Sequence, residues 1–357
     1  MFWDGRRRGD IPELAVIRIA PLPEWSRRGT VKAREWCDGP RSRMMPGFES
    51  SSAMKSSRAP GRIVANIMAM ASALATLMAC SSAALLNVLV PGEGYTVVSG
   101  LAYGTDPRQR LDVYTPSNAV GSAPVLVFFY GGSWKGGNRN YYRFVGEAFA
   151  VRGYVVVVPD YRVYPAVRFP AFVEDGANAL RWVERNASRY GGDASRIIVA
   201  GHSAGAHLGA LLLFDQRYLA DLAFDRDRLL GFVGLAGPYA FNPLAYDSTR
   251  EVFATVDHPD QARPVAHVDG GEPPVLLMHG EDDTTVEMIN GQKLAARVHE
   301  TGGEARFVTY PGRTHVGLIL SLAAPFRGRD SVHADMLAFM DRLSSRVDPL
   351  DAVASAR

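Results

Sequence analysis

Short apolar segments alternate with longer amphipathic segments over most of the chain, from about residue 95 to residue 345. Several of the short segments are apolar at every position, which is typical of strands that a parallel sheet buries on both faces. The strands predicted from this pattern span residues 95–98, 110–114, 124–130, 154–159, 196–200, 230–235, 274–279 and 305–310.

The amphipathic segments predict helices between these strands, at residues 141–152, 172–190, 204–214, 290–301 and 331–345. This alternation predicts one α/β domain over residues 95–347, built on a mostly parallel, doubly wound sheet. Residues 238–271 lack clear periodicity and contain several Pro and Asp, so they are predicted to form a short cap or lid between two core strands. Residues 80–94 are predicted to be a tether.

The chain before this domain has a different character. Residues 1–53 show no sustained periodicity and are predicted to be an unstructured upstream extension, left untranslated if translation starts at Met54. Residues 54–62 are basic and residues 63–79 are an uncharged apolar run that ends before Cys80, which predicts a lipoprotein-type signal with Cys80 lipidated. The alternatives are an uncleaved membrane anchor, because residues 63–90 are uncharged and long enough to span a bilayer, and a buried helix of a cytosolic protein.

Composition and charge narrow the classes of function. The 357 residues are 47% hydrophobic, which excludes a mostly disordered chain, and two cysteines exclude a disulfide framework or a cysteine-based zinc module. Residues 1–79 carry 13 Lys/Arg against 7 Asp/Glu, whereas residues 80–357 carry 26 against 30. The predicted domain is therefore mildly acidic and has no electrostatic footprint for nucleic acid.

The strongest chemical signal is the sequence G-H-S-A-G at residues 201–205. It follows a predicted strand and opens a predicted helix, the context that a nucleophile elbow requires. Small residues two positions before and after Ser203 allow a tight turn that exposes the serine hydroxyl above the sheet. The motif therefore predicts Ser203 as the nucleophile of a hydrolase.

A serine nucleophile needs a base and an acid, which follow it along the chain in this type of fold. Three adjacent acids, at positions 281–283, follow the predicted strand 274–279, and the pattern H-G-x-x-D-x-x-V favours Asp283 over Asp282. His315 follows the next strand after a short turn and is the predicted base. The remaining histidines have plainer interpretations at a strand end, on helices or in the predicted lid.

A tetrahedral intermediate also needs donors for its oxyanion. Ala204, directly after the nucleophile, is predicted to supply one backbone N–H. The loop Y-G-G-S-W-K-G-G at residues 130–137 is predicted to supply others from Gly131 and Gly132, because glycines let backbone N–H groups face a substrate.

These motifs together resemble the α/β-hydrolase fold, and within it the esterases and lipases whose loop reads H-G-G-x-W. The stretch G-H-S-A-G-A-H-L at 201–208 also resembles arylformamidases and feruloyl-esterase-like carboxylesterases. The stretches P-D-Y-R at 159–162 and F-P-A-F-V-E-D at 169–175 resemble hormone-sensitive-lipase-like esterases. The resemblance covers residues 95–345 and implies a triad of Ser203, Asp283 and His315. Tyr130 departs from the family, which usually has histidine there, so the way the glycine loop is held is an open question.

The predicted function is hydrolysis of small carboxylic esters by acyl transfer, without a metal or organic cofactor. The alternatives are an amide hydrolase of arylformamidase or peptidase type on the same triad, and a catalytically idle hydrolase fold used for binding. The leader predicts an exported bacterial protein, attached to a membrane through Cys80 or through its apolar segment.

Overall fold

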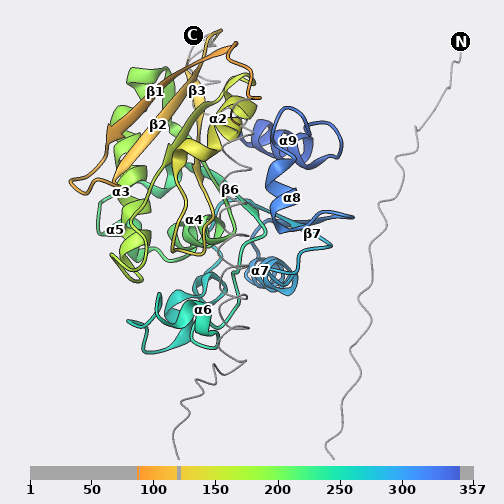
Figure 1. The fold of residues 1–357 in the computed structure, drawn as a ribbon. Coiled ribbons are helices and arrows are strands. Elements are labelled where there is room, and N and C mark those ends of the chain that lie inside the picture. Colours follow the sequence, from red (N-terminus) through yellow and green to blue (C-terminus); the bar gives the residue numbers. More distant parts are fainter. Residues whose placement is uncertain (1–86, 88, 119–121, 346–357) are drawn as a thin grey trace, which may run out of the picture. The chain divides into compact units, whose positions relative to one another are not determined.

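A computed structural model describes residue 87, residues 89–118 and residues 122–345 of the chain (Figure 1). The predicted upstream extension, the export segment and Cys80 lie outside these residues, as does most of the predicted tether.

The core of the described chain is one sheet with strand order β1-β2-β4-β3-β5-β6-β7-β8. The pairings β1–β2 and β2–β4 are antiparallel, and every pairing from β4 through β8 is parallel. The strands are β1 (Tyr95–Ala102), β2 (Arg110–Pro116), β3 (Ala123–Phe129), β4 (Val155–Pro159), β5 (Gly192–His202), β6 (Leu229–Leu235), β7 (Val275–Gly280) and β8 (Ala305–Tyr310). Because the carboxyl ends of parallel strands meet at one edge of the sheet, the loops after β3, β5, β7 and β8 open on the same side.

Helices cover both faces of the sheet (Figure 1). The α-helices are α2 (Arg143–Ala150), α3 (Ala171–Asn186), α4 (Ala204–Phe214), α5 (Arg217–Ala220), α6 (Asp247–Arg250), α7 (Ile289–Glu300), α8 (His315–Leu320) and α9 (Val332–Ser344). The helices α2 and α9 contact each other through the rings of Phe149 and His333. The helices α3 and α4 contact each other on the opposite side of the sheet, where Gly176 lies against Leu208.

Two-sided coverage explains the continuous apolar pattern of the central strands. Every residue of β4 and β7 is buried, and so is nearly every residue of β3. The outer strands β1 and β8 are partly exposed along their length, and their sequences mix polar and apolar residues accordingly. The predicted doubly wound α/β architecture is thus the observed one.

Several element ends differ from the prediction. The segment predicted as helix 141–152 opens with a 3₁₀ turn, η1 (Arg139–Tyr142), because the Asn138 side chain accepts a hydrogen bond from the Asn140 N–H and caps this tighter turn. The segment predicted as helix 172–190 ends as α3 at Asn186 and continues as a second 3₁₀ turn, η2 (Ala187–Tyr190). Strand β5 is longer than predicted, and α8 was not predicted at all.

The segment predicted as a lid connects β6 to β7 and contains only short helices. These are α6 and the 3₁₀ turns η4 (Pro259–Ala262) and η5 (Pro264–His267); a further 3₁₀ turn, η3 (Arg226–Arg228), precedes β6. The buried His207 of α4 donates from Nε2 to the carbonyl of Ala262 at 2.7 Å, which ties the segment to the helix that follows β5. In the part of the chain described here, no helix has the length and apolar character that crossing a membrane requires.

Candidate active site

The turn between β5 and α4 holds Ser203 in a strained conformation. Its φ and ψ are 55° and −122°, outside the regions that residues with a side chain ordinarily adopt. Strand β5 ends at His202 and α4 begins at Ala204, so the turn consists of the serine alone. Such strain costs about 1–3 kcal/mol and persists only where the surrounding structure enforces it.

The two glycines that flank the turn make this conformation sterically feasible. A Cβ added to Gly201 would lie 2.5 Å from the carbonyl group of Gly205, and one added to Gly205 would lie 2.1 Å from the carbonyl oxygen of Phe129. Both distances are too short for non-bonded atoms. The G-x-S-x-G spacing therefore reflects close packing of backbone on backbone.

The side chains of Ser203, His315 and Asp283 form a continuous chain of hydrogen bonds. His315 Nε2 lies 2.9 Å from Ser203 Oγ, and His315 Nδ1 lies 2.7 Å from Asp283 Oδ2. The three residues follow β5, β7 and β8, so the sheet brings together positions that are 112 and 32 residues apart. Asp282, the alternative acid, is exposed.

Asp283 lies in a site built to hold a carboxylate. Its Oδ1 accepts hydrogen bonds from the N–H groups of Thr285 and Val286 at 2.8 and 2.9 Å. Its Oδ2 lies 2.7 Å from His315 Nδ1 and 3.3 Å from His279 Nε2. Burial opposes ionisation, but the hydrogen bonds from His279, His315 and Val286 outweigh it and hold the pKa of Asp283 well below its usual range.

An ionised Asp283 fixes the tautomer of His315. A carboxylate can only accept hydrogen bonds, so Nδ1 of the imidazole carries the hydrogen. The other ring nitrogen, Nε2, is then free to accept the proton of the Ser203 hydroxyl. This is the geometry that a general base acting on a serine hydroxyl requires.

His202 contacts both the backbone and the ring of His315. Its Nε2 donates to the carbonyl oxygen of His315 at 3.0 Å, and the two rings lie 4.7 Å apart. Burial, and the charge that His315 can carry, lower the pKa of His202 to about 3, so this imidazole stays neutral. His202 occupies the second position of the G-H-S-A-G motif, and this contact could not be foreseen from the motif.

The depressed pKa of Asp283 has a consequence for stability. The usual pKa of an aspartate is 3.8, and a lower pKa in the folded chain means that the ionised form stabilises the fold above that pH. This contribution, on the order of 2 kcal/mol for hydrogen bonds to a charged group, is lost as the pH falls toward the folded-state pKa. Urea denaturation of Asp283→Asn should therefore show a deficit in unfolding free energy relative to wild type at pH 7 that shrinks by pH 3.

The exposed neighbour Asp282 offers a matched control for that measurement. Asp282→Asn should leave the unfolding free energy nearly unchanged at both pH values, because the Asp282 side chain is solvated. A deficit of Asp283→Asn that stays constant from pH 7 to pH 3 would contradict the stabilising role of the ionised carboxylate.

The glycine loop lies directly beside the serine. A Cβ on Gly131 would lie 3.0 Å from the Cβ of Ser203, and the φ of Gly132 is +145°, a value that disfavours a side chain. The loop closes on itself, because the N–H groups of Lys135 and Gly136 both donate to the carbonyl of Gly132. The structure thus places Gly131 beside Ser203, and the assignment of Gly131, Gly132 and Ala204 as oxyanion donors stays a prediction.

A pocket of about 540 Å³ opens next to Ser203. Trp134 and Phe241, stacked with their ring centroids 5.7 Å apart, form an apolar wall. Most of the other lining residues come from the segment after β6, from the chain between Asp283 and α7, and from the first turns of α7. They include Pro238, Asn242, Tyr246, Thr249, Thr285, Val286, Ile289 and Lys293.

Sequence reasoning missed part of this pocket. Ser133 lines it together with Ser203 and Ala204, and its φ of 53° shows that the loop turns sharply there. The sequence feature that could have indicated Ser133 as a pocket residue is its position directly after Gly131 and Gly132. His258 and His267, the histidines of the predicted lid, are not among the residues that line the pocket. Among the described residues, no group of three or more His, Cys, Asp or Glu side chains is placed to hold a metal ion.

Comparison with solved structures identifies the architecture. Esterase B from Lactobacillus rhamnosis superposes with a TM-score of 0.67 at 21% identity, over 82% of this chain and 98% of that one. The propionate-bound esterase Est2 from Thermogutta terrifontis superposes with a TM-score of 0.59 at 25% identity, over 71% and 96%. The chain has the α/β-hydrolase fold. The predicted fold class is thereby confirmed.

The proteins whose sequences are similar to this chain include several with esterase names. The family described as BD-FAE matches residues 111–225. Isoprenylcysteine alpha-carbonyl methylesterase of Arabidopsis thaliana is 29% identical over 67% of this chain and 60% of its own length. Esterase LipC of Mycobacterium tuberculosis is 32% identical over 60% of this chain and 58% of its own. The chain thus spans less than two thirds of the length of these two relatives.

Proposed function

We propose that this α/β hydrolase is a serine hydrolase that cleaves carboxylic esters by acyl transfer. The observation that carries the proposal is the hydrogen-bonded series Ser203–His315–Asp283 at the edge of a pocket. The esterase names of its relatives support the same class of reaction.

Acylation begins at the hydrogen bond between His315 Nε2 and the Ser203 hydroxyl. As the Ser203 oxygen attacks the ester carbonyl carbon, its proton moves to His315 Nε2, and the carbonyl π electrons move to oxygen. Asp283 stabilises the imidazolium that forms. His315 then gives the proton to the leaving alcohol as the carbonyl reforms, and the acyl group stays on the serine.

Deacylation repeats these steps with water. His315 takes a proton from water, the hydroxide attacks the acyl carbon, and the proton returns to Ser203 as the free acid leaves. In both steps the negative oxygen would be held by backbone N–H groups of the glycine loop and of Ala204. Donors placed before the reaction lower the barrier because they need no reorganisation.

The pocket suits an ester with an apolar part and a polar part. Trp134 and Phe241 supply flat apolar surface, whereas Asn242, Thr249 and Lys293 supply polar groups along the same space. A volume of about 540 Å³ is that of a small-molecule site. We therefore assign the substrate to small esters and include a methyl ester among the test substrates, since relatives are named methylesterases.

A fluorophosphonate probe tests the proposed nucleophile directly. The probe should attach covalently to the wild-type chain, and peptide mass spectrometry should locate the adduct on Ser203. The Ser203→Ala chain should remain unlabelled at the same probe concentration. Labelling of another residue, or equal labelling of both chains, would refute the assignment.

Parallel kinetics separate the proposed reaction from its alternatives. p-Nitrophenyl acetate, p-nitrophenyl butyrate and a methyl ester should be turned over with a higher kcat/KM than N-formylkynurenine or a peptide substrate. The opposite order would assign an amide hydrolase on the same residues. A chain that neither turns over any of them nor reacts with the probe would be an idle scaffold used for binding.

A further inference from the structure

Tyr130 is the first residue of the glycine loop at residues 130–137, and its side chain is fully buried. Its ring stacks between Tyr142 and Tyr161, with centroid distances of 5.2 and 5.0 Å. Burial and the neighbouring Asp160 raise the pKa of Tyr130 well above its usual value, so the phenol keeps its proton. It is therefore a permanent hydrogen-bond donor.

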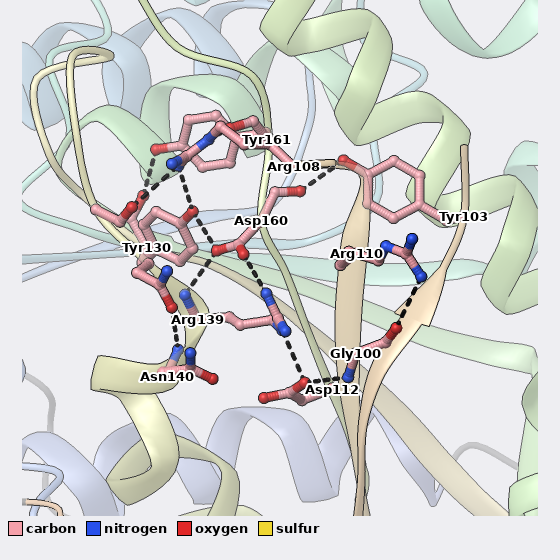
Figure 2. A network of polar contacts seen from close by, with 12 residues as sticks. Gly100, Tyr103, Arg108, Arg110, Asp112, Tyr130, Arg139, Asn140, Asp160 and Tyr161 are labelled. Atoms are coloured by element: carbon pink, nitrogen blue, oxygen red, sulfur yellow. Dashed lines mark hydrogen bonds and ion pairs between the residues drawn. The ribbon is translucent and has the colours of Figure 1, made fainter. Parts of the chain in front are cut away.

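The donor has a charged acceptor (Figure 2). The Tyr130 hydroxyl lies 2.6 Å from Asp160 Oδ1, and the same oxygen accepts the backbone N–H of Arg139 at 2.6 Å. The Arg139 guanidinium pairs with the other carboxylate oxygen of Asp160 and, through Nε, with Asp112 at 2.8 Å. Asp160 is buried, so its charge depends on these partners, and a buried charge held in this way resists displacement.

Hydrogen bonds from Tyr161 and Arg108 hold the two ends of the glycine loop, residues 130–137. At the first end, Tyr161 donates its hydroxyl proton to the carbonyl oxygen of Tyr130 at 2.7 Å. At the second end, Arg108 Nη2 lies 3.0 Å from the carbonyl oxygen of Gly137 and 3.2 Å from the Tyr130 hydroxyl. Gly137 also packs on the Tyr130 ring, where an added Cβ would lie 2.5 Å from a ring carbon.

Tyr130 also contacts the turn that holds Ser203. The carbonyl of Tyr130 lies against Gly205, where an added Cβ would approach the oxygen to 2.3 Å, and the next residue, Gly131, is packed against Ser203. Tyr130 is thus connected through its side chain to Asp160 and through its backbone to the serine turn. A shift of Tyr130 relative to the sheet would therefore move the backbone N–H groups of the glycine loop relative to Ser203.

We infer that Tyr130, through its hydroxyl bond to Asp160, is a positioning residue that sets the oxyanion donors of the glycine loop. The inference rests on the proposed function and assigns the positioning of the loop to a phenol–carboxylate pair. A phenol carries its polar atom farther from the backbone than an imidazole does. The charged acceptor accordingly lies beyond the ring, on the residue directly after β4.

Tyr130→Phe tests the inference because it keeps the stacked ring and removes only the hydroxyl. For p-nitrophenyl butyrate, kcat should fall by about 10-fold to 100-fold, since small displacements of catalytic groups have effects of this size. KM should change by less than about twofold, because ground-state binding does not use the oxyanion donors. Affinity for a trifluoromethyl ketone, whose adduct with serine carries an oxyanion, should fall with kcat/KM.

Tyr154→Phe is the matched control. Tyr154 is also buried and donates to a carboxylate, Asp341, at 2.7 Å, but it lies before β4 at the end of the sheet away from Ser203. Both variants should lose stability in urea by similar amounts, and only Tyr130→Phe should lose kcat. Rates are compared under conditions where denaturation curves show each chain fully folded.

The outcomes are distinguishable. If Tyr130→Phe loses stability but keeps the wild-type kcat and ketone affinity, the hydroxyl is structural and the inference is overturned. A parallel loss of kcat in Tyr154→Phe would also overturn it, because the effect would then be general. If the wild-type chain turns over no ester, it is the proposed function that fails.

Discussion

Replacing Ser203 with alanine should lower kcat for p-nitrophenyl butyrate by a factor on the order of 10⁶, the size of effect seen when a serine hydrolase loses its nucleophile. The loss is large because His315 then has no hydroxyl to activate, although the pocket remains. Residual turnover above the uncatalysed rate should come from the backbone donors and from binding alone. Initial rates at saturating ester, with the chain at high concentration, measure the change.

The fold of Ser203→Ala should be unaffected, and a remote serine provides the comparison. Ser195 is exposed and its hydroxyl bonds only to Asp193 among the described residues, so Ser195→Ala should keep the wild-type kcat. Both variants should unfold in urea near the wild-type midpoint. Undiminished turnover by Ser203→Ala would mean that a different group is the nucleophile.

Replacing Gly205 with alanine should cost about 3 kcal/mol of unfolding free energy, at the upper end of what overpacking typically does. The added methyl group would lie 2.1 Å from the carbonyl oxygen of Phe129 and 2.3 Å from that of Tyr130. Neither atom is the end of a flexible side chain, so α4 would have to move away from β3. Urea denaturation followed by circular dichroism measures the change, and ester hydrolysis by the folded fraction should fall as well.

Another glycine of the same helix separates this clash from a general effect of alanine. A Cβ on Gly209 would meet ring atoms of Phe232 at 3.0 Å and a methyl group of Val199 at 3.2 Å, and such side chains can shift. Alanine also favours a helix over glycine by about 1 kcal/mol. Gly209→Ala should therefore change stability little. Equal losses in the two variants would show that backbone packing at Gly205 is not special.

The architecture could be predicted because its strongest determinants are local. A strand buried on both faces, such as β7, must be apolar at every position, and the alternation with amphipathic helices then leaves few arrangements. The short helix α8 was missed because its six residues are too few to show a helical period. Its start depends on Thr314, whose hydroxyl accepts the Gly317 N–H, a signal visible only once the turn after β8 is known.

The nucleophile, acid and base could be proposed from sequence because each follows a recognisable strand. The way Tyr130 is held could not, since its partners Arg108 and Asp160 are 22 and 30 residues away and lie in loops. The sequence showed a tyrosine where the resemblance leads one to expect histidine. It did not show that Asp160 accepts a hydrogen bond from this tyrosine. His202 was missed for a similar reason, because its bond to the His315 carbonyl spans 113 residues.

Many residues of the segment between β6 and β7 line the pocket, whereas Ser203, Asp283 and His315 follow β5, β7 and β8. The parallel pairing of β6 with β7 does not depend on how many residues join them. Closing a connection twice as long would cost only about 0.6 kcal/mol of chain entropy. Insertions and deletions in this connection are therefore a low-cost route to new substrate ranges, in nature or in the laboratory, while the reacting atoms stay where the sheet has put them.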